Sequence, residues 1–401
     1  MRLLIAGGGT GGHLFPGIAV AEEFLSRDPE NSVLFVGTER GIEARAVPAA
    51  GYRIELITAA GIRGKGIFNQ LKGAAMMLYG YALSRRILKR FRPDFVLGVG
   101  GYASLPMVLA AKGMQIPRYI HEQNAIPGMT NKLLARFVDR VFITLEESAR
   151  FFPQDATQVT GNPLRRQILN MVAKQNPPSI PPLQKGGSEQ SEQGGFRLFV
   201  FGGSQGAHAI NSAMIAALPR LADLAERLEI CHQTGENDCP EVRAAYGNSG
   251  IPSSVQAFIS DMAAEYHKAD LIICRAGATT IAEVTACGKA CLFIPFPHAV
   301  DDHQRRNAEA LLKKQACFML LEHELSGERL AATIRGLMND LETLRKTGQA
   351  AFGLARLDAA RIIVDEMMKT NTPPRRHRER QPSDLTGLNT KICLPLDFSW
   401  F

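Results

Sequence analysis

The sequence predicts an α/β protein made of two doubly wound parallel sheets that face a common cleft. Short β-rich runs alternate with helical patterns along most of the 401 residues. One polar stretch interrupts this alternation, and a glycine-rich turn follows the first strand of each half. Because such sheets bind ligands beyond the carboxyl ends of their strands, we expect the ligand between the two halves.

The first domain is expected at residues 1–165, and the second at 196–345. In the first domain the pattern predicts strands at 2–6, 33–37, 53–58, 95–99, 117–121 and 140–144, and helices at 16–26, 41–50, 68–91, 103–112 and 128–136. In the second it predicts strands at 196–201, 228–232, 271–274, 291–295 and 317–321, and helices at 207–217, 277–286, 303–314 and 327–338. A helical run at 342–369 follows, and its part near 350–369 is expected to pack back on the first domain.

Two segments are expected to lack fixed structure. Residues 176–195, "NPPSIPPLQKGGSEQSEQGG", contain almost no apolar side chain and read as a linker insertion. Residues 370–401 are rich in proline and arginine and show no clear period.

Composition excludes several classes of protein. No run of about eighteen apolar residues is present, so we expect no membrane span. The seven cysteines form no C-x-x-C pair and are read as reduced thiols of a cytoplasmic protein. The net charge of +7 is unevenly spread, because residues 61–92 hold eight Lys or Arg and no acid. No nucleic-acid recognition motif accompanies these charges, so we expect no nucleic-acid partner.

Three glycine-rich loops stand at strand ends: "GGGTGGH" (7–13), "GVGGYAS" (98–104) and "GGSQGA" (202–207). A further turn, "RAGATT" (275–280), precedes a helix in the same way. Unpaired amides at a helix N-terminus favour phosphate groups. Gly7, Gly9 and Gly12 also satisfy G-x-G-x-x-G, but the acid that a nicotinamide cofactor would need about twenty residues later is absent. Tight packing alone would explain one such loop, but not three around one cleft.

Eight motifs in order resemble the MurG family of glycosyltransferases over roughly residues 1–369. They are "GGGTGGHLFPGIAVA", "GIRGKGI", "GVGGYAS", "HEQNAIPGMTNKLLA", "TGNPLR", "GGSQGAHAIN", "CRAGATTIAEV" and "PFPHAVDDHQRRNA". The resemblance implies a GT-B fold of two Rossmann-like domains, with UDP-N-acetylglucosamine held mainly by the second. It implies transfer of N-acetylglucosamine to undecaprenyl-diphospho-N-acetylmuramoyl-pentapeptide (lipid I), giving lipid II for peptidoglycan, and hence a role in cell-wall growth, cell shape and division.

The resemblance also implies site residues. Donor contacts are expected from Thr10, Gly11, Gly12, Asn124, Arg165, Ser204, Ile259, Ala278, Thr279, Thr280, Ile281, Ala282, Glu283 and Gln304. The loops with Gly9, Gly100, Gly101 and Tyr102 are expected to face the diphosphate and sugar of the acceptor. UDP-N-acetylglucosamine, lipid I, an anionic membrane and other cell-wall enzymes are the expected partners.

The residues themselves suggest how the chemistry would run. The chain contains no Asp-x-Asp, so we expect no metal cofactor; the turn at 277–280 with Arg165 would stabilise the departing diphosphate. The two carboxylate oxygens of Glu283 would suit the cis hydroxyls of a ribose. The alternative is that Glu283 is a solvated residue on its helix. An inverting displacement needs one base. His13, kept neutral by the helix N-terminus, is the candidate, with Glu122 as its rival and His121 as an orienting group. Alternatively, His13 caps the loop or donates to a phosphate.

The stretch "GAAMMLYGYAL" (73–83) has no charged residue and is flanked by basic ones. It predicts either a core helix or a helix laid on an anionic lipid surface, and the acid-free flanks favour the second. The residues expected to face the membrane are Leu71, Lys72, Met76, Tyr79, Arg85 and Arg86. We therefore expect a peripheral protein on the cytoplasmic side of the inner membrane.

Two alternative functions stay open at this point. A UDP-N-acetylglucosamine 2-epimerase of the same fold would share the donor and need no membrane. A non-catalytic module would bind the sugar nucleotide without releasing UDP.

Overall fold

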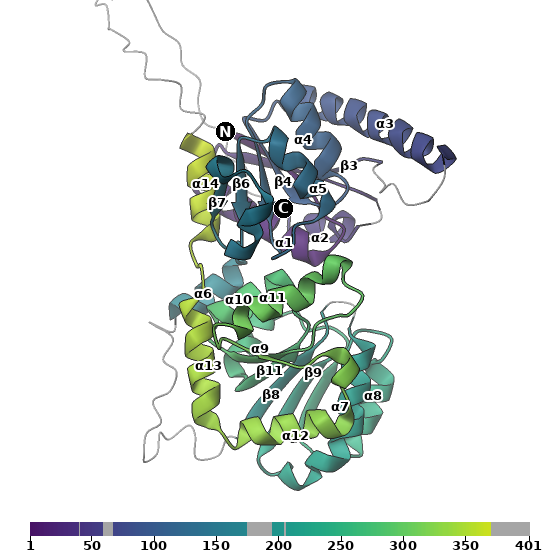
Figure 1. Ribbon diagram of the computed structural model, residues 1–401, viewed down its shortest axis with the longest axis vertical. Helices are drawn as coiled ribbons and strands as arrows, with labels where there is room; N and C mark the ends of the chain where they lie inside the picture. Colours follow the sequence, from purple (N-terminus) through teal and green to yellow (C-terminus); the bar gives the residue numbers. More distant parts are fainter. Residues whose placement is uncertain (40, 59–66, 175–194, 204–205, 370–401) are drawn as a thin grey trace, which may run out of the picture.

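The computed structural model describes residues 1–39, 41–58, 67–174, 195–203 and 206–369, with the backbone alone for 67–74. Two α/β lobes lie one above the other, joined near α6 (Figure 1). Apart from Gly195, the expected linker at 176–195 lies outside the described residues, as does the expected tail at 370–401. Within the described part, no helix is long and apolar enough to cross a membrane.

The first lobe is a seven-stranded, fully parallel sheet in the order β3-β2-β1-β4-β5-β6-β7. Its strands are β1 (Arg2–Gly7), β2 (Ser32–Gly37), β3 (Arg53–Leu56), β4 (Phe95–Gly100), β5 (Arg118–Glu122), β6 (Arg140–Ile143) and β7 (Thr157–Val159). Its helices are α1 (Gly11–Ser26), α2 (Glu43–Ala49), α3 (Ile67–Phe91), α4 (Ser104–Gly113) and α5 (Met129–Leu134). The strand order reverses between β1 and β4, so the loops that follow these strands open at the switch point of the sheet.

The second lobe repeats this plan with six parallel strands in the order β10-β9-β8-β11-β12-β13. They are β8 (Phe196–Phe201), β9 (Leu228–Gln233), β10 (Ser253–Gln256), β11 (Leu271–Cys274), β12 (Ala290–Phe293) and β13 (Phe318–Met319). The helices are α6 (Arg166–Lys174), α7 (His208–Leu221), α8 (Cys239–Gly247), α9 (Met262–Lys268), α10 (Ala278–Ala286), α11 (His303–Leu312), α12 (Gly327–Met338) and α13 (Leu341–Gly353). The switch point here lies between β8 and β11.

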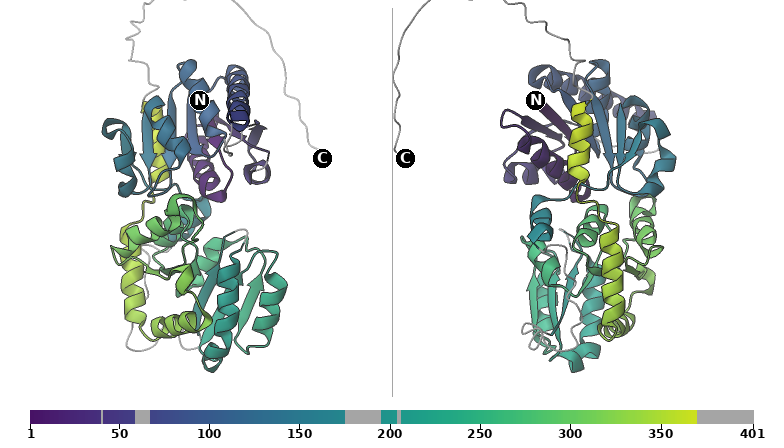
Figure 2. Two further views of the ribbon diagram at one scale, coloured as in Figure 1. Left: turned by 45° about the vertical axis from the view of Figure 1, so that its right-hand side comes forward. Right: turned by 90° about the vertical axis from the view of Figure 1, so that its left-hand side faces the viewer.

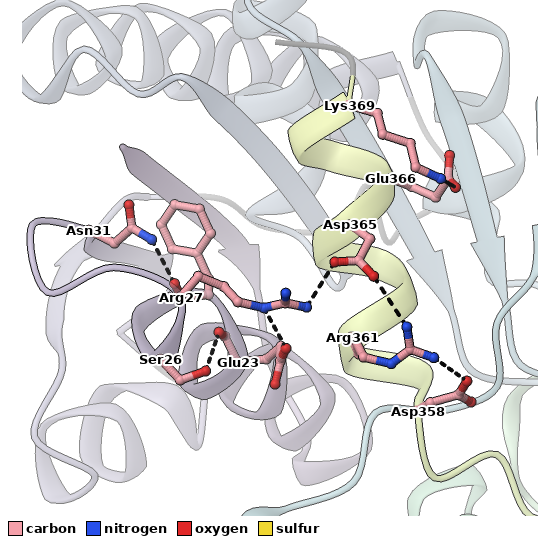
Figure 3. Close-up of polar contacts among 10 residues, drawn as sticks. Glu23, Ser26, Arg27, Asn31, Asp358, Arg361, Asp365, Glu366 and Lys369 are labelled. Carbon is pink, nitrogen blue, oxygen red and sulfur yellow. Dashed lines mark hydrogen bonds and ion pairs between the residues drawn. The ribbon is translucent and has the colours of Figure 1, made fainter. Parts of the chain in front are cut away.

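The helical run expected at 342–369 is two helices that belong to different lobes. α13 packs against α10 and β12, so the second lobe extends to about residue 353 rather than 345. After a break, α14 (Ala359–Lys369) packs on α1 of the first lobe (Figure 2). Ile363 and Val364 enter the first lobe's core, and Arg27, which follows α1, donates to Asp365 at 2.8 Å (Figure 3).

The elements that the sequence patterns did not predict are short. The first turn of α1, which starts at a glycine, was not predicted either. α1 begins at Gly11, five residues before the expected start, because its first turn is built from glycines and carries Pro16 within the helix. β7, α6, α8, β10 and α9 were not predicted; each spans nine residues or fewer. Short apolar periods of this kind are hard to tell from loops, and packing against the larger sheets stabilises them.

Candidate active site

The glycine loops after β1 and β4 pack directly on each other. The amide of Gly8 donates to the carbonyl of Gly100 at 3.2 Å. A Cβ on Gly101 would lie 2.5 Å from the carbonyl oxygen of Gly8, and one on Gly100 would lie 2.9 Å from Nδ1 of His13. The side-chain positions of Gly100 and Gly101 are thus occupied by the neighbouring loop and by His13, whereas the Tyr102 side chain beside them is 49% exposed.

The buried carboxylate of Glu43 fixes the first glycine loop by hydrogen bonding. The amide of Gly9, expected to face the acceptor diphosphate, donates to Oε2 of Glu43 at 2.6 Å. The amide and hydroxyl of Thr38 donate to Oε1 of the same carboxylate at 2.9 and 3.0 Å. This amide is therefore already paired and is not available to a phosphate. Glu43 was not predicted from the sequence, because its partner Gly9 lies 34 positions away in another loop.

His13 lies in the first turn of α1, where the two glycine loops meet. Its Nδ1 is 2.8 Å from Oε1 of Gln123, in the loop that follows β5, and its side chain is partly exposed. Burial lowers the pKa of the neighbouring His121 to about 4, and proximity to His13 adds to this, although a bond to the Gly161 carbonyl acts in the opposite direction. His121 is therefore neutral at physiological pH.

The carboxylate of Glu122, the alternative candidate for the base, forms its hydrogen bonds within its own loop. Its carboxylate is buried and accepts from the amide and side chain of Asn124 at 2.9 and 3.2 Å. It also accepts from the amide of Gly128 and from Nδ2 of Asn131 at 3.2 and 2.9 Å. Both oxygens are thus used to shape residues 122–131, and this geometry argues against a base role for Glu122.

The N-terminal ends of α1 and α10 meet across the boundary between the lobes (Figure 1). Oγ1 of Thr279 donates to the carbonyl of Gly12 at 3.2 Å. Pro16 makes this contact possible, because a proline has no N–H to bond the carbonyl four residues earlier. The structure thus brings Gly11, Gly12 and Thr279 together, with Thr10 exposed at the edge and Thr280 partly buried in α10.

Arg165 and Glu283, both expected donor contacts, pair with each other. Nε of Arg165 lies 2.7 Å from Oε1 of Glu283, whose Oε2 accepts from the Tyr266 hydroxyl at 3.1 Å. Glu283 is buried, which excludes the solvated reading. Burial disfavours the charged Arg165, but the carboxylate of Glu283, together with smaller contributions from Tyr266 and Glu22, more than offsets this, so the pKa of Arg165 is raised. The guanidinium also lies 5.1 Å from the ring of Phe15, on α1 of the other lobe.

Asn307 lies at the lobe boundary beside the expected donor contact Asn124 and was not predicted from the sequence. It lies on α11, is fully buried, and its Oδ1 accepts the amide of Ala125 in the first lobe at 2.9 Å. Its Nδ2 donates to Oδ1 of Asn124 at 3.2 Å, so an expected donor contact is engaged by the opposite lobe. A signal was available, because this asparagine lies in the motif from which only Gln304 was chosen.

The remaining expected donor contacts are dispersed. Oε1 of Gln304 accepts the amide of Phe296 at 3.0 Å, and the side chain of Ile259 is buried in the core of the second lobe. Ala278 is buried at the start of α10, while Ile281 and Ala282 line a separate cavity of about 120 Å³ where the lobes are joined. These last two side chains therefore face the junction rather than the end of α10. Ser204 lies outside the described residues.

In the described part of the chain, no group of three or more His, Cys, Asp or Glu side chains could hold a metal ion. The lobe boundary carries the Arg165–Glu283 pair, Glu22 of α1 against the amide of Arg166, and two helix N-termini. Such a set suits a phosphorylated, hydroxyl-rich ligand.

Comparison with known proteins agrees with this geometry. Residues 3–143 match the glycosyltransferase family 28 N-terminal domain, and residues 197–363 match the C-terminal domain of the same family. The class is therefore a glycosyltransferase with the GT-B fold, in which two Rossmann-like lobes enclose the site.

A curated relative identifies the particular family. The protein of Trichlorobacter lovleyi called UDP-N-acetylglucosamine–N-acetylmuramyl-(pentapeptide) pyrophosphoryl-undecaprenol N-acetylglucosamine transferase is 67% identical over 377 residues, which cover 93% of this chain and 99% of that protein. The crystal structure of MurG from Acinetobacter baumannii matches with a TM-score of 0.72 and 32% identity, over 92% of this chain and 99% of that one. The chain belongs to this family of N-acetylglucosamine transferases.

The epimerase alternative is not favoured. A UDP-GlcNAc 2-epimerase from Neisseria meningitidis matches with a TM-score of 0.63, over 92% of this chain and 100% of that one, but at 15% identity. A likeness at this level shows a shared fold and nothing further. The family assignment also makes the chain an enzyme, so the non-catalytic alternative is set aside.

Proposed function

We propose that this chain transfers N-acetylglucosamine from UDP-N-acetylglucosamine to the C4 hydroxyl of the muramoyl residue of lipid I, with inversion, giving lipid II. The step belongs to peptidoglycan synthesis, and with it to cell-wall growth, cell shape and division. The observation that carries the proposal is the position of His13, where both glycine loops meet, in the helical turn that α10 contacts from the other lobe.

His13 acts as the general base in this proposal. Its imidazole accepts the proton of the C4 hydroxyl while that oxygen attacks the anomeric carbon and the bond to the diphosphate breaks, releasing UDP. The donor diphosphate competes with Glu283 for the guanidinium of Arg165, which frees the carboxylate for the ribose hydroxyls. The N-terminal ends of α1 and α10 stabilise the negative charge of the leaving group, so that no metal ion is required.

Transfer of labelled sugar from UDP-N-acetylglucosamine to a short-chain lipid I analogue tests the proposal directly. We expect β-linked product in equal yield with and without chelator, and a loss in kcat of about 100-fold or more for His13→Ala at nearly unchanged donor KM. Product formation at the wild-type rate by His13→Ala would remove this residue from the mechanism. A requirement for a divalent ion would overturn the metal-independent route.

We further propose that α3 attaches the enzyme to the cytoplasmic face of an anionic membrane. Figure 1 shows α3 extending beyond the edge of the first lobe. Leu78 is 71% and Tyr79 57% exposed, Met76 is partly exposed, and Arg85 and Arg86 are exposed nearby. Apolar side chains beside cations on one protruding helix suit an interfacial position. Leu71 and Lys72 belong to the part of α3 whose side chains are not described.

Vesicles that contain about one-third anionic lipid test this attachment. We expect the double variant Leu78→Asp, Tyr79→Asp to lose at least 10-fold in vesicle affinity while its melting temperature stays close to wild type, because both side chains are exposed. Leu341→Asp, at a leucine of α13 in the other lobe that is 51% exposed, is the matched control. Unchanged binding of the double variant would place the membrane contact elsewhere.

A further inference from the structure

We propose that Gln123 is a positioning residue that holds His13 in the tautomer with the proton on Nδ1, so that Nε2 is the proton acceptor. The inference rests on the proposed role of His13 as base, and it assigns a new role to a buried residue that was not among the expected site residues. It follows from a series of hydrogen bonds that links the carbonyl of Gly161, through His121 and Gln123, to His13.

The orientation of the Gln123 amide is fixed by a backbone carbonyl. Nε2 of Gln123 lies 3.0 Å from the carbonyl oxygen of Val99, which can only accept a hydrogen bond. The nitrogen must therefore face Val99, and Oε1 must face His13. Because Gln123 is buried, no solvent is present to compensate a flipped amide.

A second carbonyl fixes the tautomer of His121. Nε2 of His121 lies 3.1 Å from the carbonyl oxygen of Gly161, so this nitrogen carries the proton. Its Nδ1 is then an acceptor and receives the other N–H of Gln123 at 3.1 Å. Burial keeps His121 neutral, since its pKa is lowered to about 4, and a neutral ring maintains this arrangement. Both N–H groups of the Gln123 amide are thereby used.

The last hydrogen bond of this series determines the tautomer of His13. Oε1 of Gln123 is 2.8 Å from Nδ1 of His13, so a neutral ring must donate from Nδ1. The other tautomer would bring two lone pairs together at this distance. When the substrate hydroxyl transfers its proton to Nε2, the imidazolium keeps its Nδ1–H on the amide oxygen, which stabilises the new charge. The missing side chain of Gly100 leaves room for the ring in this position.

The experiment uses the full chain labelled with ¹⁵N in its nine histidines, and the His13 signals are assigned by their loss in His13→Ala. Long-range ¹⁵N–¹H spectra at neutral pH should show a protonated Nδ1 and an unprotonated Nε2. In Gln123→Met, which has a similar volume and no hydrogen bond, we expect the Nε2–H tautomer to become populated and kcat to fall by about 10- to 100-fold, with donor KM within about twofold.

Asn31→Leu is the matched control, because it removes a buried amide that bonds the Phe24 carbonyl at 2.7 Å in a different part of the lobe. It should lower stability and leave both the His13 signals and kcat unchanged. A protonated Nδ1 that persists in Gln123→Met, or a wild-type His13 with its proton on Nε2, would overturn the positioning role. If the tautomer shifts as expected but His13→Ala retains full turnover, the assignment of His13 as base fails, and the two failures are thus distinguished.

Discussion

Gly100 shows at the residue scale how a missing side chain serves the site. Its φ of +99° and the nearby ring of His13 both disfavour any other residue. Gly51 has a similar φ of +81°, but a Cβ there would meet nothing within 4 Å. Each alanine should cost about 1–2 kcal/mol of backbone strain. Only Gly100→Ala should also displace His13, so we expect its kcat to fall at least 10-fold while Gly51→Ala retains activity.

Steady-state transfer assays and urea unfolding of the two variants separate these effects. Equal losses of stability with unequal losses of kcat would support the packing of His13 against Gly100. If both variants kept the wild-type rate, the ring of His13 would not depend on this contact.

His232 makes the stability of the second lobe depend on pH. It is buried between Tyr246 and Asn211, and burial lowers its pKa to about 3. The unfolded chain, with an ordinary pKa near 6.5, binds a proton that the folded state does not bind between these two values. Stability is therefore fully present above about pH 6.5 and falls on acidification, by about 2 kcal/mol at pH 5 from this residue alone.

Urea unfolding at pH 7 and pH 5 measures this contribution. In His232→Gln, which lacks the titrating group, we expect the loss of stability between the two pH values to shrink by about 2 kcal/mol, whatever its absolute stability. An unchanged pH dependence would mean that His232 is protonated in the folded state.

Local sequence patterns predicted the positions of the site residues better than they predicted the contacts of those residues. His13 follows a strand and a glycine turn, so its place at a helix N-terminus could be read from neighbouring residues. The partners of Glu122 and Glu283 could not, because Arg165 lies 118 positions from Glu283 and the amide of Asn131 reaches Glu122 only after the loop has folded. Hydrogen bonds between distant segments leave no periodic signal in the sequence.

At the scale of elements, α14 completes the core of the lobe in which the chain began. Ile363 is fully buried against that core, whereas Arg361 on the solvent side of the same helix is exposed. We expect Ile363→Ala to lower the free energy of unfolding by about 2–4 kcal/mol, because it leaves a cavity. Arg361→Ala loses only exposed ion pairs and should change stability by less than about 1 kcal/mol.

Chemical denaturation of both variants measures this difference, and hydrogen exchange at first-lobe amides locates it. A loss of equal size in the two variants would mean that α14 is not part of the first lobe's core. The division between α13 and α14 was not predicted, because helical patterns stand on both sides of the short break after Gly353, and the packing of the two helices on different lobes leaves no local signal.

α1 illustrates how one residue couples an element to the whole molecule. Pro16 leaves the carbonyl of Gly12 without its helical partner, and Thr279 of the other lobe supplies the missing donor. A proline usually marks a helix boundary, so the sequence pattern predicted a helix that starts at Pro16, and the first turn of α1 was not predicted. The tertiary hydrogen bond from Thr279, rather than local sequence preference, accounts for the first turn of α1.

At the scale of the whole molecule, few buried polar contacts join the lobes, and Asn307 makes two of them. Replacing it with leucine removes the acceptor for the Ala125 amide and leaves that amide buried. We therefore expect Asn307→Leu to speed hydrogen exchange at Ala125 by at least 10-fold and to raise the donor KM several-fold, since the lobes must hold the nucleotide together. Asn211→Leu is the matched control, because Asn211 is equally buried but bonds only within the second lobe. If both variants changed Ala125 exchange alike, the effect would be a general loss of stability; a change confined to Asn307→Leu would show that this asparagine sets how the two lobes meet at the site.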